Sequence, residues 1–496
     1  MCRKLIYRVG AAMIAFAVAA CAVGPNYRRP TIASPQAFRG QLHPSPDRTL
    51  ADLPWWRVFR DEALQQLVRE ALANNHDLRI AIARIEQARA LQTQARANFF
   101  PQLGYQAEAT RLGGPQQLSV AGIQIPAGQT ASGSRETANA FAVAGNASWE
   151  LDLWGGIRRG NEAATAALLA TEEARRGVVQ SLVADVAQDY FQLRDLDMEL
   201  EIARRDRDAF SDLVGIFKKQ KVGGIASDLE ISRATALEAQ IAASIPETER
   251  QIALTENALS FLLGRNPGPI RRGAALTAQY SPPAIPAGLP SALLERRPDI
   301  RQAEQNLIAA NANVGVAVSK FLPTVDLTAA LGAVSPQLYL LTSGRGNFWN
   351  IGGAATGPLF QGGRLVGVYR EMKALRDQAQ LQYQRTALSA FADVSNALVS
   401  RRKYAEAAAQ DARQVTALRT SVSVVRERYV GGVSTYIELL EPQQELFPAE
   451  IALTRARLAQ LVATVQLYKA LGGGWAEGER SPERFGFRFR ADLRDP

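Results

Sequence analysis

Cysteine and histidine are scarce in this chain, with two of each among 496 residues. His43 and His76 lie far apart in the sequence, which disfavours a histidine-based catalytic triad or zinc site. After Ala20 the chain also lacks an apolar run of the roughly 18 to 20 residues that a membrane-spanning helix needs. The net charge of +9 is spread through segments that also carry many acidic residues, without a nucleic-acid-binding motif. We therefore interpret the charged residues as lying on the solvent-exposed surfaces of helices.

The chain opens with an export signal. A basic start is followed by a short apolar stretch, residues 9–20, that ends in small residues. The sequence Val18-Ala19-Ala20-Cys21 is similar to a bacterial lipoprotein cleavage site with Cys21 as the acylated first residue, and ordinary secretion is the alternative. Two acyl chains would hold the protein on a membrane, where one binds only marginally. Cleavage at this site removes Cys2, so we expect neither disulfides nor cysteine metal sites.

What the sequence does contain is an internal repeat. Asn75-His76-Asp77-Leu78-Arg79 leads through a helical stretch into Phe99-Phe100-Pro101, and Arg297-Pro298-Asp299-Ile300-Arg301 leads through a similar stretch into Phe321-Leu322-Pro323. Each copy continues with strand-like sequence, a Gly-Gly pair, a very long helical run and a second Gly-Gly pair. We interpret this as a duplicated helix–strand–helix unit. The pairs are Gly155-Gly156 and Gly223-Gly224 in the first copy, and Gly362-Gly363 and Gly431-Gly432 in the second.

Helix dominates both copies. The stretches from about 157 to 221 and from about 364 to 430 contain no proline, and each predicts on the order of 90 to 100 Å of helix. Return helices are expected at roughly 227–263 and 434–471, and a further helical stretch at about 61–98. Helices this long pack as coiled coils or tubes, although an ordinary bundle core is the alternative. A heptad seam is indicated by Val415, Leu418, Val422, Val425 and Tyr429.

Four segments alternate between apolar and polar residues, as transmembrane barrel strands do. Leu103, Tyr105 and Ala107 alternate with polar residues in the first, and Val325 and Leu327 in its counterpart. A half-buried soluble sheet would alternate in the same way. Four strands cannot close a barrel, and an open edge cannot lie in lipid, so strands in a membrane would require several copies. Two copies would give a barrel filled by side chains, and three would leave a lumen.

These patterns divide the chain into six parts. Prolines prevent helix in the segment after the signal, which we interpret as a tether, and a second group of prolines marks a linker between the repeats. The strand pairs are expected at about 99–154 and 322–361, and the hairpin tips at about 221–227 and 430–434. The parts are the signal 1–20, the tether 21–56, the first repeat 57–265, the linker 266–290, the second repeat 291–474 and the tail 475–496.

Five motifs follow one another along the chain: Cys21-Ala22-Val23-Gly24-Pro25-Asn26-Tyr27-Arg28-Arg29-Pro30, Trp55-Trp56-Arg57-Val58-Phe59, Trp149-Glu150-Leu151-Asp152-Leu153-Trp154-Gly155, Arg296-Arg297-Pro298-Asp299 and Pro358-Leu359-Phe360-Gln361-Gly362-Gly363. In this order they resemble outer-membrane efflux lipoproteins of the OprM/NodT type, which are relatives of TolC. The resemblance covers essentially all of the chain after the signal. It implies a homotrimer with a twelve-stranded barrel in the outer membrane and a helical barrel through the periplasm.

The resemblance also implies a function. The chain would be the passive exit duct of a tripartite efflux system, docked to a periplasmic adaptor and an inner-membrane pump of the RND type. It implies no catalysis and no cofactor, apart from covalent lipid such as palmitate on Cys21. Two alternatives remain open: the outer-membrane channel of a type I protein secretion system, and a periplasmic coiled-coil adaptor lipoprotein. Such an adaptor typically has one hairpin, whereas this chain has two.

In members of the family, carboxylates just beyond the second hairpin turn surround the closed periplasmic opening. Glu438 and Glu441 match these positions, and their spacing can place both on one helix face. Three copies would bring six carboxylates around one axis, which favours cations over anions. Asp228 matches a position that latches neighbouring hairpins, with Tyr429 or Arg428 as its partner. Gly223, Gly224, Gly431 and Gly432 would form the tip turns, and solvated helix charge is the alternative for the three carboxylates.

Overall fold

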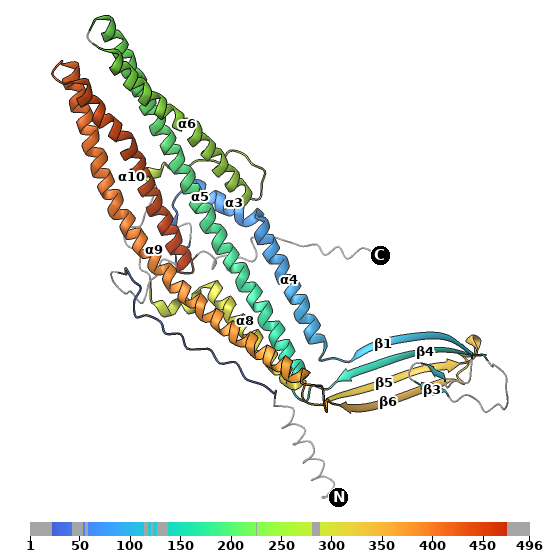
Figure 1. Ribbon diagram of the computed structural model, residues 1–496. Helices are drawn as coiled ribbons and strands as arrows, with labels where there is room; N and C mark the ends of the chain where they lie inside the picture. The colour runs from blue at the N-terminus through green and yellow to red at the C-terminus, as the bar shows by residue number, and fades with distance from the viewer. Residues whose placement is uncertain are drawn as a thin grey trace. The chain divides into compact units, whose positions relative to one another are not determined.

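The protein is described by a computed structural model, drawn in Figure 1. The signal peptide, Cys21, His43, the Trp55-Trp56 pair and the tail 475–496 lie outside the described residues. The described part of the chain divides into two compact units. The first contains the described residues of Met1–Pro30, Ile85–Ala170 and Ala303–Gln382, and the second those of Thr31–Arg84, Thr171–Gln302 and Tyr383–Pro496. The structure describes residues 22–41, 53–54, 58–113, 118–120, 123–125, 137–224, 226–279 and 288–473.

The first unit is built on one four-stranded antiparallel sheet that both repeats share (Figure 1). Its order is β1-β4-β5-β6, so the repeats meet where β4 pairs with β5. A separate antiparallel pair, β2 with β3, lies between β1 and β4 in the chain. The strands are β1 (Gln102–Gly113), β2 (Leu118–Val120), β3 (Ile123–Ile125), β4 (Thr137–Glu150), β5 (Thr324–Ser335) and β6 (Asn347–Thr356).

The pairing register places large apolar side chains on one face of this sheet. Tyr105 lies opposite Gly145, Gly145 opposite Leu331, and Leu331 opposite Trp349, so one cross-strand row runs through all four strands. Tyr105 is 89% exposed and Trp349 74% exposed, which shows that this face is uncovered in the single chain. The same face carries Leu103, Val143, Ala147, Trp149, Leu327, Ala329 and Ile351, and the other carries Gln102, Gln106, Asn146, Ser148, Thr328 and Asn350. The predicted two-faced strands are confirmed.

Helix lengths repeat in the two halves of the chain. The helix before each strand pair has 22 residues, the long helix 67 and the return helix 35. None of the described helices is both long and apolar enough to cross a membrane. The helices are α4 (His76–Ala97), α5 (Gly156–Val222) and α6 (Asp228–Leu262) in the first half, and α8 (Pro298–Ser319), α9 (Arg364–Val430) and α10 (Tyr436–Ala470) in the second. Shorter helices are α3 (Glu62–Asn74), α7 (Leu293–Arg296), η2 (Leu276–Ala278), η3 (Pro290–Ala292) and η4 (Leu338–Leu340).

The helical stretch expected from about 61 to 98 is two helices, and the continuous interpretation is wrong. Asn75 separates α3 from α4 with an extended ψ of 132°. Its side-chain oxygen accepts a hydrogen bond from the backbone N–H of Leu78, which caps α4, and its amide donates to the carbonyl of Leu262. Asparagine is among the best helix N-caps, so this break was readable from the sequence.

In the second unit the two long hairpins, α5–α6 and α9–α10, pack against each other. Phe210, Leu213 and Phe217 of α5 share one buried cluster with Ile241 of α6 and Leu439 of α10. A second, smaller cluster joins the predicted seam residue Val415 of α9 to Ala449 and Leu453 of α10. Burial of such apolar side chains stabilises the hairpins by about 1.5–3 kcal/mol per large residue.

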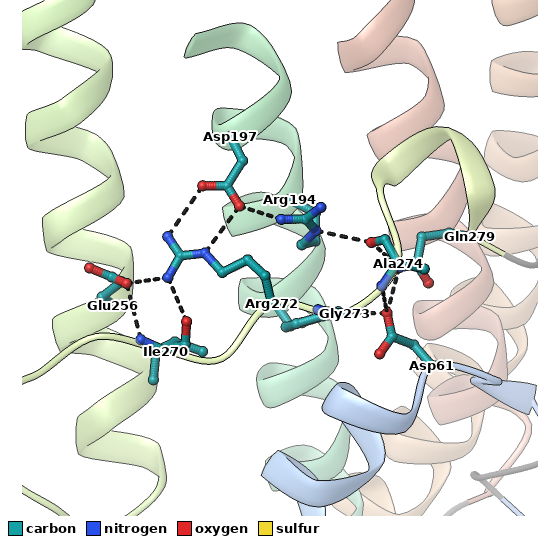
Figure 2. Close-up of polar contacts among 10 residues, drawn as sticks. Asp61, Arg194, Asp197, Glu256, Ile270, Arg272, Gly273, Ala274 and Gln279 are labelled. Carbon is teal, nitrogen blue, oxygen red and sulfur yellow. Dashed lines mark hydrogen bonds and ion pairs between the residues drawn. The ribbon is translucent and has the colours of Figure 1, made fainter. Parts of the chain in front are cut away.

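A polar network holds the connector after α6 against α5 and α6 (Figure 2). Nε and Nη2 of Arg272 donate to the two oxygens of Asp197 at 3.1 and 3.2 Å, and Nη1 donates to Glu256. Arg194 donates both to Asp197 and to the carbonyl of Ala274. The guanidinium groups thus fix an otherwise irregular segment to two helices, as bidentate arginine contacts do well.

Asp61 is the centre of the same network. Its carboxylate accepts the N–H groups at the start of α3 and also the Tyr190 hydroxyl at 2.8 Å, the Ala274 N–H at 3.0 Å and the Gln279 amide at 2.7 Å. Burial alone would raise the pKa of Asp61, but these hydrogen bonds outweigh it and hold the pKa below its ordinary value. A Cβ on Gly273 would lie 2.2 Å from this carboxylate, so only glycine fits there.

We expect Asp61→Asn to lower the free energy of unfolding by about 2 kcal/mol at pH 7, because an amide cannot accept all of these donors. The lowered pKa means that the carboxylate stabilises the fold above its ordinary pKa of about 4, and that this contribution is lost as the pH falls further. The difference from wild type should therefore shrink below that pH. Thermal unfolding of the purified protein followed by circular dichroism measures it. Asp208→Asn, which removes an exposed carboxylate paired only with Arg207, is the control. Equal losses in both variants would contradict the account.

Candidate functional site: the hairpin tips and the N-terminal segment

The turn of the second hairpin is set by one glycine. Gly432 has a φ of +72°, and its N–H donates to the carbonyl of Tyr429 while the next N–H, that of Val433, donates to Arg428. These two bonds form a Schellman ending, which needs a left-handed residue that glycine adopts without strain. Gly224 has a φ of +75° at the matching place after α5. The predicted tip turns are thus present, and the second glycine of each pair supplies the left-handed conformation.

Glu438 lies in the first turn of α10 and has a local partner. Thr435 is the N-cap of α10; its hydroxyl accepts the Glu438 N–H at 3.4 Å and donates to the Glu438 carboxylate at 3.1 Å. The hydroxyls of Ser434 and Thr435 lower the pKa of Glu438, so this carboxylate is ionised at neutral pH. This capping role was readable from the Thr-x-x-Glu spacing.

Glu441 follows one turn later and is exposed, as Glu438 is. Between them Leu439 and Leu440 are buried in the cluster with α5. The two carboxylates therefore stay in solvent on the uncovered side of α10, while the apolar side of the same turns packs. This arrangement leaves both free to face a common axis if several copies assemble.

The predicted latch of Asp228 to Tyr429 or Arg428 of a neighbouring hairpin stays a prediction for the assembled protein, because in the single chain Asp228 has another partner. Asp228 forms an ion pair with Lys221, across the turn of its own hairpin. The Tyr429 hydroxyl instead donates to the side-chain oxygen of Gln220 at 2.9 Å. Lys221 lies directly before the turn and so reaches Asp228 locally, whereas the contact of Tyr429 with Gln220 joins residues far apart in the sequence. Tyr429 of α9 still joins the two hairpins, through Gln220 of α5.

An aromatic cluster at the same level was missed by the sequence reasoning. The ring of Phe217 meets that of Tyr436 edge to face at a centroid distance of 4.8 Å and that of Tyr429 at 6.1 Å. Phe217 is fully buried. Edge-to-face pairs add about 0.5–1.5 kcal/mol to the burial of the rings. The three residues belong to α5, α9 and α10, so this cluster joins the two hairpins near their tips.

The N-terminal segment of the first unit is held in one extended path. The N–H of Val23 donates to the carbonyl of Trp154 at 2.9 Å, and Arg159 donates to the carbonyl of Val23 and to Asn26. Asn311 of α8 donates to the carbonyl of Pro25 at 2.8 Å. These contacts explain why the motif after Cys21 is specific: its backbone is bound by α5 and α8.

Close packing against two glycines fixes the position of the first described residues of this segment. A Cβ on Gly155 would lie 2.7 Å from the Cα and Cβ of Ala22, so residue 22 packs directly against the turn between β4 and α5. Gly24, with a φ of +94°, lies so close to Gly315 that a Cβ would approach its Cα to 2.5 Å. The residue before Ala22 is Cys21, which lies outside the described residues.

No group of three or more histidine, cysteine, aspartate or glutamate residues that could hold a metal ion occurs in the described part of the chain. His76, at the first position of α4, is exposed. The structure thus describes the glycine turns and the exposed carboxylates of α10 in the second unit and, separately, the bound N-terminal segment in the first.

The chain matches known proteins over nearly its whole length. The sequence model of the family described as "Outer membrane efflux protein" matches residues 67–265 and 289–473. The probable efflux pump outer membrane protein TtgC of Pseudomonas putida is 33% identical over 472 residues, covering 94% of this chain and 95% of that protein. The cation efflux system protein CusC of Escherichia coli is 30% identical over 469 residues, covering 94% and 98%.

Solved structures show the same fold. The open state of the MtrE outer membrane channel of Neisseria gonorrhoeae has a TM-score of 0.81 at 30% identity, covering 92% of this chain and 99% of that one. The CmeC outer membrane channel of Campylobacter jejuni has a TM-score of 0.82 at 25% identity, covering 92% and 95%. The chain therefore belongs to the outer membrane efflux proteins, a family of channels rather than enzymes, and its place is the outer membrane.

Proposed function

We propose that this outer-membrane efflux channel is the passive exit duct of a tripartite system, in which a periplasmic adaptor and an inner-membrane pump of the RND type supply substrate and energy. The observation that carries the proposal is the sheet: both repeats contribute strands to one surface with an apolar and a polar face. A polar face lining a water-filled path and an apolar face toward lipid are what a membrane conduit needs. No catalytic group and no cofactor other than lipid enters this role.

The working form is a homotrimer. The sheet has the order β1-β4-β5-β6, so β1 and β6 each lack one neighbour in the single chain. Three chains of four strands supply twelve, which close into a barrel with a lumen, whereas two supply a barrel filled by its own side chains. The threefold symmetry of such a trimer also places six helical hairpins, two from each chain, around one axis.

Substrate choice belongs to the pump. Relatives of similar identity have names that refer to antibiotic, toluene and cation efflux. Because comparable channels serve such different chemistry, a wide polar path fits better than a selective binding pocket. We propose drugs or other small molecules as the cargo, in preference to the proteins of a type I secretion system.

The gate is formed by the hairpin tips. Three copies of Glu438 and Glu441 place six ionised or ionisable carboxylates near the axis, which attract cations and repel anions. The adaptor would bias the tips towards the open state by binding that state better than the closed one. The exposed apolar residues of the tips offer it a surface; they include Val222, Leu229, Val430, Val433 and Ile437.

Cys21 carries the lipid anchor. Ala22 is packed at the helix-proximal end of the sheet, so acyl chains on the preceding residue would enter the membrane leaflet nearest the helices. The bound segment from Val23 to Asn26 then acts as a short, fixed connection rather than a loose tether.

Charge removal at the tip tests the conduit and its gate. The double variant Glu438→Gln/Glu441→Gln should reduce the cation-to-anion permeability ratio several-fold in single-channel recordings, because six negative charges leave the axis. Glu406→Gln, an exposed charge in the middle of α9, is the control and should leave the ratio unchanged. An unaltered ratio in the double variant would remove the gate assignment, and absence of channels in the wild type would remove the proposed function.

Lipidation is tested with labelled palmitate. Cys21→Ser should abolish incorporation of the label into the protein, whereas Cys2→Ser, in the cleaved signal, should not affect it. Label that persists in Cys21→Ser would show that acylation occurs elsewhere. No label in the wild type would show that the signal belongs to ordinary secretion.

A further inference from the structure

The return helix α10 is held in two different ways along its length. Its half beyond Glu450 is tied to α5 by polar side chains in one antiparallel register. Arg455 donates to both oxygens of Glu199, Gln466 donates to Gln188 at 2.9 Å, and Lys469 lies 4.0 Å from Asp185. Such directional contacts allow one register only, since a shift of one residue would separate every pair.

Glu450 forms the last of these polar contacts on the side nearer the tip. We call the polar contacts of Glu450, Arg455, Gln466 and Lys469 the polar ladder. Its side chain is 3% exposed, and one oxygen accepts two N–H groups of Arg419 at 2.9 and 2.6 Å. The other oxygen accepts from Arg205. Glu450 therefore joins α10 to α9 and to α5 at one point, and a buried carboxylate with two guanidinium partners is costly to release.

Between Glu450 and the tip, α10 has no comparable ties. In this part of the described hairpins, no side chain of residues 436–447 forms a hydrogen bond or ion pair with α5 or α9. The hydroxyl of Tyr436 and the side-chain oxygen of Gln443 are buried without a partner. Contacts here are the apolar packing of Leu439 and Leu440 and the edge-to-face contact of Tyr436 with Phe217, which fix the register less strictly than paired hydrogen bonds do. We call residues 436–447 the arm.

The arm joins the anchored half through two prolines. Pro442 and Pro448 lie inside α10. Neither can donate to the carbonyl four residues earlier, so the helix lacks two hydrogen bonds within two turns. A cleft of about 470 Å³ lies beside this stretch, lined by Gln443, Leu446 and Glu450 together with residues of α5 and α9. The helix is thus weakened where its packing is also interrupted.

The first hairpin provides the contrast. Its return helix α6 contains one proline, Pro246, and is tied to α5 on both sides of it. Asp228 pairs with Lys221 on the tip side, and Glu249 pairs with Arg204 at 2.6 Å on the other. A proline in α6 therefore interrupts a helix whose two parts are both fixed.

From these contacts we infer that the arm of α10 is a hinged element that swings about Pro442–Pro448, with Glu450 as the positioning residue that fixes the rest of the helix. The inference rests on the proposed function, because the arm carries Glu438 and Glu441. It places the hinge inside α10 rather than at the Gly431-Gly432 turn. Opening would slide the apolar face of the arm over α5 and leave the polar ladder intact.

Amide hydrogen exchange of the full-length protein in lipid nanodiscs tests the hinge without any need for conduction. Peptides from 436–447 should exchange roughly tenfold faster than peptides from 450–469. The two parts of α6 on either side of Pro246, 228–245 and 247–262, are the comparison and should differ far less. Glu450→Gln should spread fast exchange into 450–469. Equal exchange in the two parts of α10, or the same asymmetry in α6, would overturn the inference.

Channel recordings test whether the hinge gates. Pro442→Ala/Pro448→Ala restores the missing hydrogen bonds and should lower the frequency of openings roughly tenfold. Pro246→Ala is the control and should leave the frequency as in wild type. If the proline pair has no effect while wild-type channels open and close, the hinge is wrong and the proposed function stands. If wild-type protein forms no channels, the proposed function fails.

Discussion

A strand in hydrocarbon must have both sides of its backbone hydrogen-bonded, and this requirement governs the whole molecule. Water is absent from the bilayer core, so each unpaired N–H or C=O costs several kcal/mol. The single chain offers a sheet with an apolar face and two edge strands, β1 and β6. The sheet can therefore lie in a membrane only when other copies pair with those edges. Assembly is thus a condition for the fold to function. The two helical hairpins of each copy are then arranged with the same symmetry as the sheets.

The duplication gives two hairpins of the same length, and the differences between their tips give the gating mechanism. The 22-, 67- and 35-residue helices recur with equal lengths, so the two hairpins present equivalent scaffolds. Their side-chain ties differ. The first return helix has a polar tie to α5 at its tip, through Asp228 and Lys221, whereas the described polar ties of the second to α5 and α9 begin at Glu450. A rigid hairpin beside one with a hinged arm gives each copy a fixed frame and a movable part.

Much of this fold could be predicted because its signals are local. Proline and glycine mark the ends of the long helices, as at Pro101 and Gly432, and alternation marks the strands. The break at Asn75 and the cap at Thr435 were also readable, since both are common N-cap residues.

The tertiary contacts could not be predicted. Asp61 meets Ala274 and Gln279, and Glu450 meets Arg205, across long stretches of chain that no spacing rule connects. The partner of Asp228 in the single chain is a different case, because Lys221 is only seven residues away. A carboxylate can pair with any cation within reach, and only the folded hairpin shows that Lys221 is nearest. The aromatic cluster of Phe217, Tyr429 and Tyr436 likewise joins three helices that the sequence does not order in space.

The central claim is that the four-stranded sheet is completed by other copies of the chain. Native mass spectrometry of the protein, extracted from membranes in mild detergent, tests it most directly. We expect one dominant species with the mass of three chains, since three sheets close a barrel with a lumen. A stable monomer or dimer that still forms channels in lipid bilayers would contradict it.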